Sequence, residues 1–282
     1  MEVFTTIAQV REFVRSHRRA GRTIGFVPTM GALHEGHLSL MRRARDECDV
    51  VVISIFVNPT QFGPGEDFER YPRDLEGDCQ KAEAVGVDAV FAPSAAEMYP
   101  DGFATFVEQE GHTVSCLEGR FRPGHFRGVL TVCLKLFNIV QPDRAYFGQK
   151  DYQQALVVRR MVRDLDVPME LVVCPTVREP DGLAMSSRNA YLSQSERAQA
   201  LSLSRGLRAA QEALRAGERD PRKLEEIVRS QIEGAGPCVI DYVVVADAET
   251  LAPVEVVDRR CVAAVAVRIG KTRLIDNCLL ER

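Results

Sequence analysis

Short apolar runs alternate with helix-patterned segments through the first 175 residues, and this alternation constrains the fold more than any other feature. The runs that read as strands cover 23–28, 50–58, 88–93, 145–148 and 169–175. The segments with apolar residues at helical spacing cover 36–48, 74–85, 126–140 and 151–164. Strand–helix alternation predicts a parallel sheet covered by helices on both faces. We therefore predict an α/β fold with a Rossmann-like, doubly wound sheet, preceded by an amphipathic helix within residues 1–20.

The pattern changes after residue 175. Segment 176–192 is polar and rich in helix breakers, which predicts a loop. Ser193 and Glu196 form a capping box for a helix over 195–216, and Pro221 suits the first position of a second helix. Three strand-like runs then follow at 239–247, 261–270 and 272–280. We predict two domains, a Rossmann-like domain over 1–175 and a smaller α+β domain over 176–282.

Composition excludes several functional classes. The net charge of −4 and the absence of tryptophan argue against a nucleic-acid partner. No apolar run approaches the roughly 20 residues that cross a bilayer, and the opening segment lacks the apolar core of a signal peptide. A cytoplasmic location is therefore expected, with no membrane partner. The eight cysteines form no C-x-x-C pair and no zinc-ligand spacing, so we expect reduced thiols.

The strongest chemical pattern follows the first predicted strand directly. Residues 28–37 read PTMGALHEGH, and they lie where a parallel α/β sheet binds its ligand, between a strand and a helix. The glycines permit close approach of the backbone, and the helix N-terminus offers unpaired N–H groups to a phosphate. His34 and His37 share one face of the first helical turn. A lone histidine on a helix is usually structural, but this pair predicts donors to a triphosphate.

The H-x-G-H pattern resembles the signature of the nucleotidyltransferase superfamily, which includes class I aminoacyl-tRNA synthetases and cytidylyltransferases. Those enzymes carry a downstream loop with a cation that reaches the phosphates. Residues 185–188, MSSR, fit such a loop, because two hydroxyls and a guanidinium can clamp pyrophosphate. Taken alone, MSSR favours a solvated interdomain linker, but together with the histidine motif, in the expected order, it favours the phosphate-binding loop.

A third segment, GQKDYQQ at 148–154, also lies at a strand-to-helix junction. Lys150 supplies a compact positive charge, and Asp151 suits the N-terminus of a helix. Gln153 and Gln154 point in different directions on the first helical turn, so one of the two amides is expected to face the cleft.

Six segments together resemble the signature blocks of the pantothenate synthetase family, in the order in which that family carries them. They are PTMGALHEGH, VNPTQFGPGEDFERYPR, MYPDGF, FRPGHFRGV, YFGQKDYQQ and PTVREPDGLAMSSRN, running from residue 28 to residue 189. The resemblance implies an AMP-forming carbon–nitrogen ligase, a pantoate–β-alanine ligase of pantothenate and coenzyme A biosynthesis. It would condense (R)-pantoate with β-alanine through an enzyme-bound pantoyl adenylate, with release of pyrophosphate and AMP. It also implies a homodimer.

The resemblance assigns roles to residues of this chain. The catalytic groups would be His37, as the proton donor, together with His34, Lys150 and Arg188. Pantoate would be held by Gln61 and Gln154, with Asn58 and Arg122 near the substrate. The ATP site would comprise Met30, Gly31, Ala32, Leu33, His34, Glu35, Gly36, His37, Gly148, Gln149, Lys150, Asp151, Val177, Met185, Ser186, Ser187 and Arg188.

Adenylate formation by this route requires Mg²⁺ in addition to ATP. The ion would be held chiefly by phosphate oxygens, with at most one or two protein carboxylates. Asp78 is the candidate metal ligand, and an ordinary surface acid is an equally good interpretation of that residue.

Three other functions share part of the pattern. A cytidylyltransferase shares the H-x-G-H turn but gives no reason for the GQKDYQQ block. A tRNA synthetase shares both phosphate motifs but normally adds an anticodon-binding domain and a basic surface. A non-catalytic nucleotide sensor would bind ATP without turning it over, and pantoate-dependent release of pyrophosphate distinguishes the enzyme from it.

Overall fold

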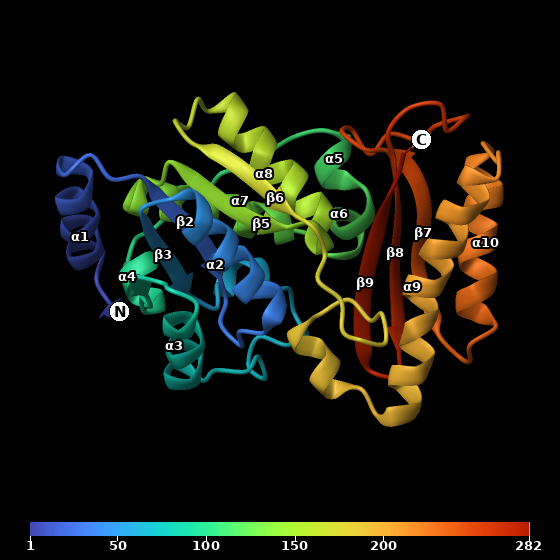
Figure 1. Ribbon diagram of the computed structural model, residues 1–282, viewed down its shortest axis with the longest axis horizontal. Helices are drawn as coiled ribbons and strands as arrows, with labels where there is room; N and C mark the ends of the chain where they lie inside the picture. The colour runs from blue at the N-terminus through green and yellow to red at the C-terminus, as the bar shows by residue number, and fades with distance from the viewer. Residues whose placement is uncertain (282) are drawn as a thin grey trace. The chain divides into compact units, whose positions relative to one another are not determined.

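In a computed structural model, which describes residues 1–281, six strands form a parallel sheet in the order β1-β4-β3-β2-β5-β6 (Figure 1). The neighbouring strands pair in parallel throughout. Their bounds are β1 Glu2–Phe4, β2 Ile24–Thr29, β3 Val50–Ile55, β4 Ala89–Phe91, β5 Arg144–Gly148 and β6 Glu170–Cys174. The central strands β2 and β3 are buried almost throughout, as expected for a sheet covered on both faces.

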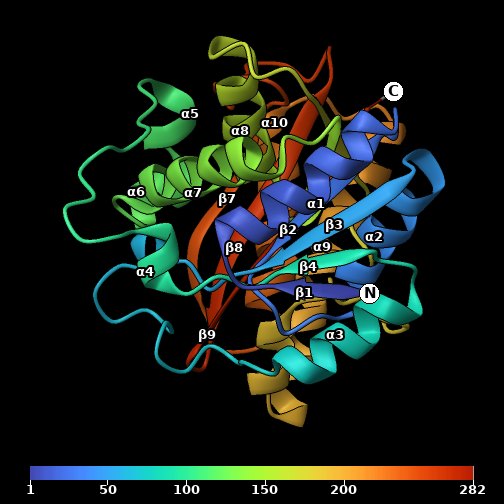
Figure 2. The ribbon, with the colours of Figure 1, turned by 90° about the vertical axis from the view of Figure 1, so that its left-hand side faces the viewer.

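Helices cover both faces of this sheet (Figure 2). One face packs against α2 and α3 through a core that includes Met41, Ala82 and Tyr146. On the other face Phe137 of α7 meets Phe26 of β2, with ring centroids 6.4 Å apart. The elements around the sheet are α1 Ile7–Arg19, α2 Glu35–Glu47, α3 Leu75–Ala84, α4 Ala95–Met98, α7 His125–Val140, α8 Tyr152–Asp164 and the 3-10 turn η1 Pro59–Gln61.

The strand order reverses at the centre of the sheet. From β2 the chain moves outward through β3 to β4, and α7 then returns it to β5, on the opposite side of β2. In a doubly wound sheet the ligand crevice lies outside the carboxyl ends of the strands at such a reversal. The residues that follow β2 are therefore placed at the position where this fold binds nucleotides.

A second sheet is antiparallel and has the order β7-β8-β9. Helices α9 and α10 pack against it through a core that includes Leu203, Leu224 and Val265 (Figure 1). The elements of this part are α5 His112–Ser115, α6 Leu117–Phe121, η2 Gln149–Asp151, η3 Ser187–Tyr191, α9 Gln194–Arg215, α10 Pro221–Glu233, β7 Val239–Asp247, β8 Cys261–Ile269 and β9 Thr272–Leu280.

The chain divides into two compact units that are interleaved in sequence. Unit 1 comprises 1–109, 122–148 and 154–175, and carries the parallel sheet. Unit 2 comprises 110–121, 149–153 and the chain from Thr176 onward, and carries the antiparallel sheet. The last passage between units falls after Pro175, where the sequence pattern changes. Segments 110–121 and 149–153 also belong to unit 2, and the sequence pattern does not predict that.

The predicted fold class is confirmed, with a Rossmann-like core and a smaller α+β unit. The capping box of Ser193 and Glu196 opens α9, and Pro221 begins α10, as predicted. The amphipathic helix predicted within residues 1–20 is present as α1, and a short strand that the sequence does not predict precedes it. Glu2–Phe4 pairs with β4 as strand β1 before a capping box at Thr6 opens α1. The one-turn helices α4, α5 and α6 were not predicted, because a single turn shows no periodicity.

All eight cysteines are free thiols, as expected. Burial raises the pKa of Cys133 and of Cys278 to about 12, so both remain protonated at neutral pH. Within residues 1–281, none of the helices combines the length and the apolar character that crossing a bilayer requires.

Candidate active site

The two motif histidines cap the helix that follows β2. The ring Nδ1 of His34 accepts the N–H of Gly36 at 3.1 Å, and the Nδ1 of His37 accepts the N–H of His34 at 3.4 Å. This reciprocal capping box satisfies two N–H groups at the start of α2. Because each Nδ1 accepts a bond, the neutral rings carry their proton on Nε2. The ring centroids are 4.1 Å apart, so the two rings lie beside each other after the carboxyl end of β2.

Asp78 of α3 fixes the backbone of the loop that leads to these histidines. Its two carboxylate oxygens accept the N–H groups of Ala32 at 2.8 Å and of Leu33 at 2.7 Å. Lys81 donates to the carbonyl oxygen of Leu33 at 3.0 Å. The loop needs this support because Gly31 and Ala32 both have positive φ, which is strained for alanine. Asp78 is 1% exposed, and the interpretation as an ordinary surface acid is wrong.

Asn58 and Gln61 form a buried amide pair at the carboxyl end of β3. Asn58 donates to the carbonyl oxygen of Gly128 and to the side-chain oxygen of Gln61, both at 3.1 Å. Its own oxygen accepts the hydroxyl of Tyr99 at 2.8 Å and that of Thr60 at 2.9 Å. Asn58 therefore orients the amide of Gln61, which directs its NH₂ group to the sulfur of Met30. Met30, Asn58 and Gln61, three predicted site residues, are in contact.

Arg122 forms a bidentate ion pair with Glu66, at 2.7 and 2.8 Å. Burial alone would raise the pKa of Glu66, but the guanidinium of Arg122 holds that pKa below its usual value. His125 connects this pair to the amide site, since its Nδ1 lies 2.9 Å from the carbonyl oxygen of Gln61 and its Nε2 lies 3.1 Å from Arg122. Glu66, Tyr99 and His125 were not assigned from the sequence, although each lies in a signature block.

The structure distinguishes the two adjacent glutamines of α8. Gln153 is buried, and its amide forms hydrogen bonds with the backbone of residues 113–118. It donates to the carbonyl oxygens of Thr113 at 2.8 Å and Cys116 at 2.9 Å, and it accepts the N–H of Glu118 at 2.9 Å. Gln154 is partly exposed and has no side-chain hydrogen bond within residues 1–281. Of the two amides, that of Gln154 is therefore available to a substrate.

Lys150 and Asp151 lie in the 3-10 turn η2, immediately after Gly148 ends β5. The ammonium of Lys150 lies 3.7 Å from the carboxylate of Asp151, and its side chain is 19% exposed. A salt bridge this long leaves most of the charge of Lys150 to act on an incoming phosphate.

The loop with the serine and arginine motif is built in two parts. A short hairpin joins Val177 to Met185, whose N–H donates to the Val177 carbonyl at 3.0 Å. Ser186 then caps η3, and its hydroxyl accepts the N–H of Arg188 at 3.3 Å. Within the described chain, Thr176 Oγ1 and Asn189 Oδ1 are buried here with no hydrogen-bond partner. Buried polar atoms in native proteins are normally paired, so these two fit a segment that binds a polar ligand.

The predicted residues are thus divided between the units. Unit 1 holds the two histidines with their loop, the amide pair, Asp78, Arg122, Gly148 and Gln154. Unit 2 holds Gln149, Lys150 and Asp151, together with Val177 and residues 185–188. Acidic side chains do not gather around a metal position: residues 1–281 contain no group of three or more metal-ligating side chains.

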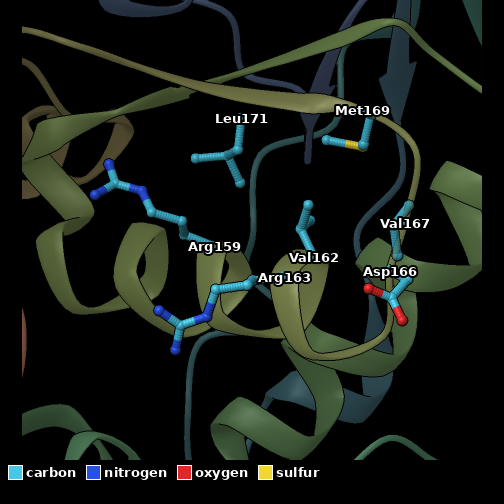
Figure 3. Close-up of a pocket in the computed structure, with 7 residues that line it drawn as sticks. All are labelled: Arg159, Val162, Arg163, Asp166, Val167, Met169 and Leu171. Carbon is cyan, nitrogen blue, oxygen red and sulfur yellow. The ribbon is translucent and has the colours of Figure 1, made fainter.

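A hollow of about 460 Å³ lies in unit 1 at α8 and β6 (Figure 3). Two arginines and apolar side chains line it, and it includes none of the predicted site residues. The lining residues are Arg159, Val162, Arg163, Asp166, Val167, Met169 and Leu171.

Comparison with known proteins identifies the family. Residues 2–279 match the family described as pantoate-beta-alanine ligase. The chain is 59% identical to the pantothenate synthetase of Moorella thermoacetica, over 100% of this chain and 99% of that protein. It is 58% identical to that of Thermotoga petrophila, over 99% of this chain and 100% of the relative.

Solved structures agree. The pantothenate synthetase of Thermus thermophilus has a TM-score of 0.96 and 48% identity, with 100% of both chains covered. The pantoate-beta-alanine ligase of Francisella tularensis, solved in complex with beta-gamma ATP and beta-alanine, has a TM-score of 0.81 and 38% identity, with 100% of this chain and 98% of that one covered. This chain therefore belongs to the pantoate–β-alanine ligase family, and it is a ligase.

Proposed function

We propose that this member of the pantoate–β-alanine ligase family joins pantoate to β-alanine through an enzyme-bound pantoyl adenylate. The observation that carries the proposal is the pair of histidines at the carboxyl end of β2, whose Nδ1 atoms are both occupied by backbone N–H groups. That arrangement aligns two Nε2–H donors before any ligand binds, which is what stabilisation of developing phosphate charge requires.

In the first step a carboxylate oxygen of pantoate attacks the α-phosphorus of ATP. A new P–O bond forms, the bond from the α-phosphorus to the bridging oxygen breaks, and pyrophosphate leaves with the electron pair. His34 and His37 donate to phosphate oxygens as this charge develops. Lys150 and Arg188 contribute positive charge to the same leaving group.

In the second step the neutral amine of β-alanine attacks the acyl carbon of the mixed anhydride. A C–N bond forms, the C–O bond to the phosphate breaks, and AMP leaves. The amine loses one proton as the amide forms. Neither step requires a covalent bond to the enzyme, so the contribution of the protein is positioning and charge stabilisation.

The amides of Gln61 and Gln154 supply the pantoate site in this proposal. Pantoate carries hydroxyl groups, and a carboxamide both donates and accepts hydrogen bonds. Gln61 and Gln154 bind these hydroxyls. Asn58 acts indirectly, by orienting the amide of Gln61. Arg122 also acts indirectly, because its guanidinium is already paired with the carboxylate of Glu66.

Magnesium fits the site as a partner of the nucleotide. Both oxygens of Asp78 already accept backbone N–H groups, so the protein offers no ready cage of carboxylates. Mg²⁺ would therefore be held mainly by phosphate oxygens, where it neutralises their charge. Each oxygen of Asp78 keeps one further lone pair, through which the carboxylate would reach the ion or one of its waters.

Exchange of labelled pyrophosphate into ATP tests the adenylate. With ATP, Mg²⁺ and pantoate present and β-alanine withheld, label should enter ATP, because the first step is complete and reversible. Omission of pantoate is the control and should abolish exchange. A requirement for β-alanine in the exchange would show that the reaction does not pass through a free-standing adenylate step.

We further propose that the enzyme is a cytoplasmic homodimer, as the family resemblance implies. Sedimentation equilibrium should give a mass of twice the 31.4 kDa of the chain. A monomer at micromolar concentration would contradict this part of the proposal without affecting the chemistry above.

A further inference from the structure

We propose that Asp276 and Asn277, adjacent residues of β9, are positioning residues that hold the two ATP-binding segments of unit 2 on one strand. The inference rests on the proposed function, because it assigns those segments to the nucleotide. Both side chains are buried, at 4% and 3% exposure, in a strand that is otherwise largely apolar. Buried polar side chains are costly unless every group is paired, so their partners show what they are for.

Asn277 holds the turn that carries Lys150. Its amide donates to the carbonyl oxygens of Gln149 and Lys150, both at 2.9 Å. Its side-chain oxygen accepts the amide of Gln149 at 3.3 Å. Three hydrogen bonds from one side chain therefore attach η2 to β9, and the backbone from which the Lys150 ammonium extends cannot shift independently of the strand.

Asp276 holds the hairpin that leads to the serine and arginine motif. Its carboxylate receives two hydrogen bonds from Arg178, at 2.7 and 3.0 Å. Arg178 also donates to the carbonyl of Gly182, inside the hairpin. Burial alone would lower the pKa of Arg178, but the carboxylate of Asp276 raises that pKa above its usual value, so the guanidinium stays charged.

The contact continues from the hairpin to Arg188. Asn189 donates to the carboxylate of Glu179 at 2.7 Å and to the carbonyl of Ala184 at 3.0 Å. These bonds attach η3, which includes Arg188, to the hairpin that Arg178 anchors. Adjacent residues of a strand point to opposite faces, so two neighbouring side chains can hold two segments that lie far apart in sequence. The segments that carry Lys150 and Arg188 are thus both held by strand β9.

Five variants test the inference, with loss of stability as the confounding effect. Asn277→Ala removes the bonds to η2, and Asp276→Asn removes the charge that pairs with Arg178. Asp241→Asn is the matched control, because Asp241 of β7 is also buried and pairs with arginines, Arg273 at 2.7 Å and Arg268 at 3.3 Å. The other two variants are Lys150→Ala and its combination with Asn277→Ala.

Pantoate-dependent pyrophosphate exchange and thermal unfolding are measured for each. We expect Asn277→Ala and Asp276→Asn to lose about 10- to 100-fold in exchange rate, the usual effect of removing a group that orients a functional residue. Asp241→Asn should keep wild-type exchange at a temperature where all variants are folded. In the Lys150→Ala background, Asn277→Ala should cost less than about 2-fold, because a residue that acts through Lys150 has nothing left to position.

The outcomes separate the inference from the function on which it rests. Absence of exchange in the wild-type enzyme would reject the adenylate proposal itself. Exchange in the wild type with an equal loss in Asp276→Asn and Asp241→Asn would show that Asp276 only stabilises the sheet. Multiplicative losses from Lys150→Ala and Asn277→Ala would show that Asn277 does not act through Lys150. Either of the last two results overturns the inference for that residue.

Discussion

At the scale of single residues, His34 combines two tasks that one substitution can separate. Its Nδ1 caps α2, and its Nε2 carries the proton proposed to reach the phosphates. Asparagine is among the best N-cap residues, so His34→Asn keeps a side-chain acceptor for the helix and removes the Nε2 donor.

We predict that His34→Asn unfolds near the wild-type temperature and loses about 10²-fold or more in turnover, the typical cost of one preorganised charge-stabilising donor. His37→Ala should also lose turnover. His17→Ala, at the exposed end of α1, is the control and should stay active. Thermal unfolding and steady-state turnover are measured for each variant. Normal turnover in His34→Asn would show that His34 serves only to cap the helix.

The two adjacent glutamines give the second residue-scale prediction. Gln154→Ala should raise the pantoate requirement about 5- to 150-fold, because a substrate hydroxyl left unpaired in a closed site costs about 1–3 kcal/mol. The ATP requirement should change less.

Gln153→Ala serves as the matched variant one residue away. It removes two hydrogen bonds to carbonyl oxygens and one from an N–H group of residues 113–118, so we expect it to lower the free energy of unfolding. Its pantoate requirement should stay closer to that of the wild type. Steady-state kinetics with each substrate varied in turn measure both requirements. If Gln153→Ala raised the pantoate requirement more than Gln154→Ala, the assignment of Gln154 to pantoate would be wrong.

At the scale of elements, the turn that ends β7 gives a prediction on pH. Asp247 accepts the N–H groups of Glu249 and Thr250 and pairs with Arg259 at 2.8 Å. Burial alone would raise the pKa of Asp247, but the arginine and the N–H groups lower it to about 2. A carboxylate with a depressed folded-state pKa stabilises the protein above its unfolded pKa, and the contribution disappears as pH falls through both values.

Asp247→Asn should therefore destabilise the protein by about 2 kcal/mol at pH 7, the order expected for a pKa depressed by nearly two units. The difference between variant and wild type should shrink as pH falls below about 4 and vanish near pH 2, the folded-state value. Denaturant unfolding across that range measures it. A difference that stays constant with pH would mean that the carboxylate charge contributes nothing.

The elements that show periodicity, and the site residues that directly follow strands, are predictable from the sequence. The central strands, the long helices and the capping box of α9 were all predictable, because burial on a strand or on one helix face leaves a pattern. The amide hub around Asn58 was not, since Tyr99 and Gly128 reach it from distant parts of the chain. Asp276 and Asn277 do leave a signal, two polar residues inside an apolar strand, but that pattern alone does not identify their partners.

At the scale of the whole molecule, the interleaved units make a domain boundary at 175 a poor place to cut the chain. Glu118, in segment 110–121 of unit 2, receives two bonds from Arg273 and one from Tyr242. A fragment that ends at Pro175 would retain Glu118 and lose β7 and β9, which carry its partners Tyr242 and Arg273.

We predict that the fragment 1–175 unfolds at a lower temperature than the full chain and is cleaved by protease within 110–121. The full chain under the same conditions is the control. A fragment that melts within about 3 °C of the full chain, the shift of roughly 1 kcal/mol at this size, would show that unit 1 does not need these contacts.

The bond between Glu118 and Arg273 spans 155 positions of the chain. A ribosome adds about 5–20 residues per second, so roughly 8 to 30 s pass between the synthesis of the two partners. During that interval Glu118 has been synthesised, but its ion-pair partner Arg273 has not. The strand that brings the arginine also brings Asp276 and Asn277, so the nascent enzyme acquires its support for Lys150 and Arg188 only after β9 has been translated.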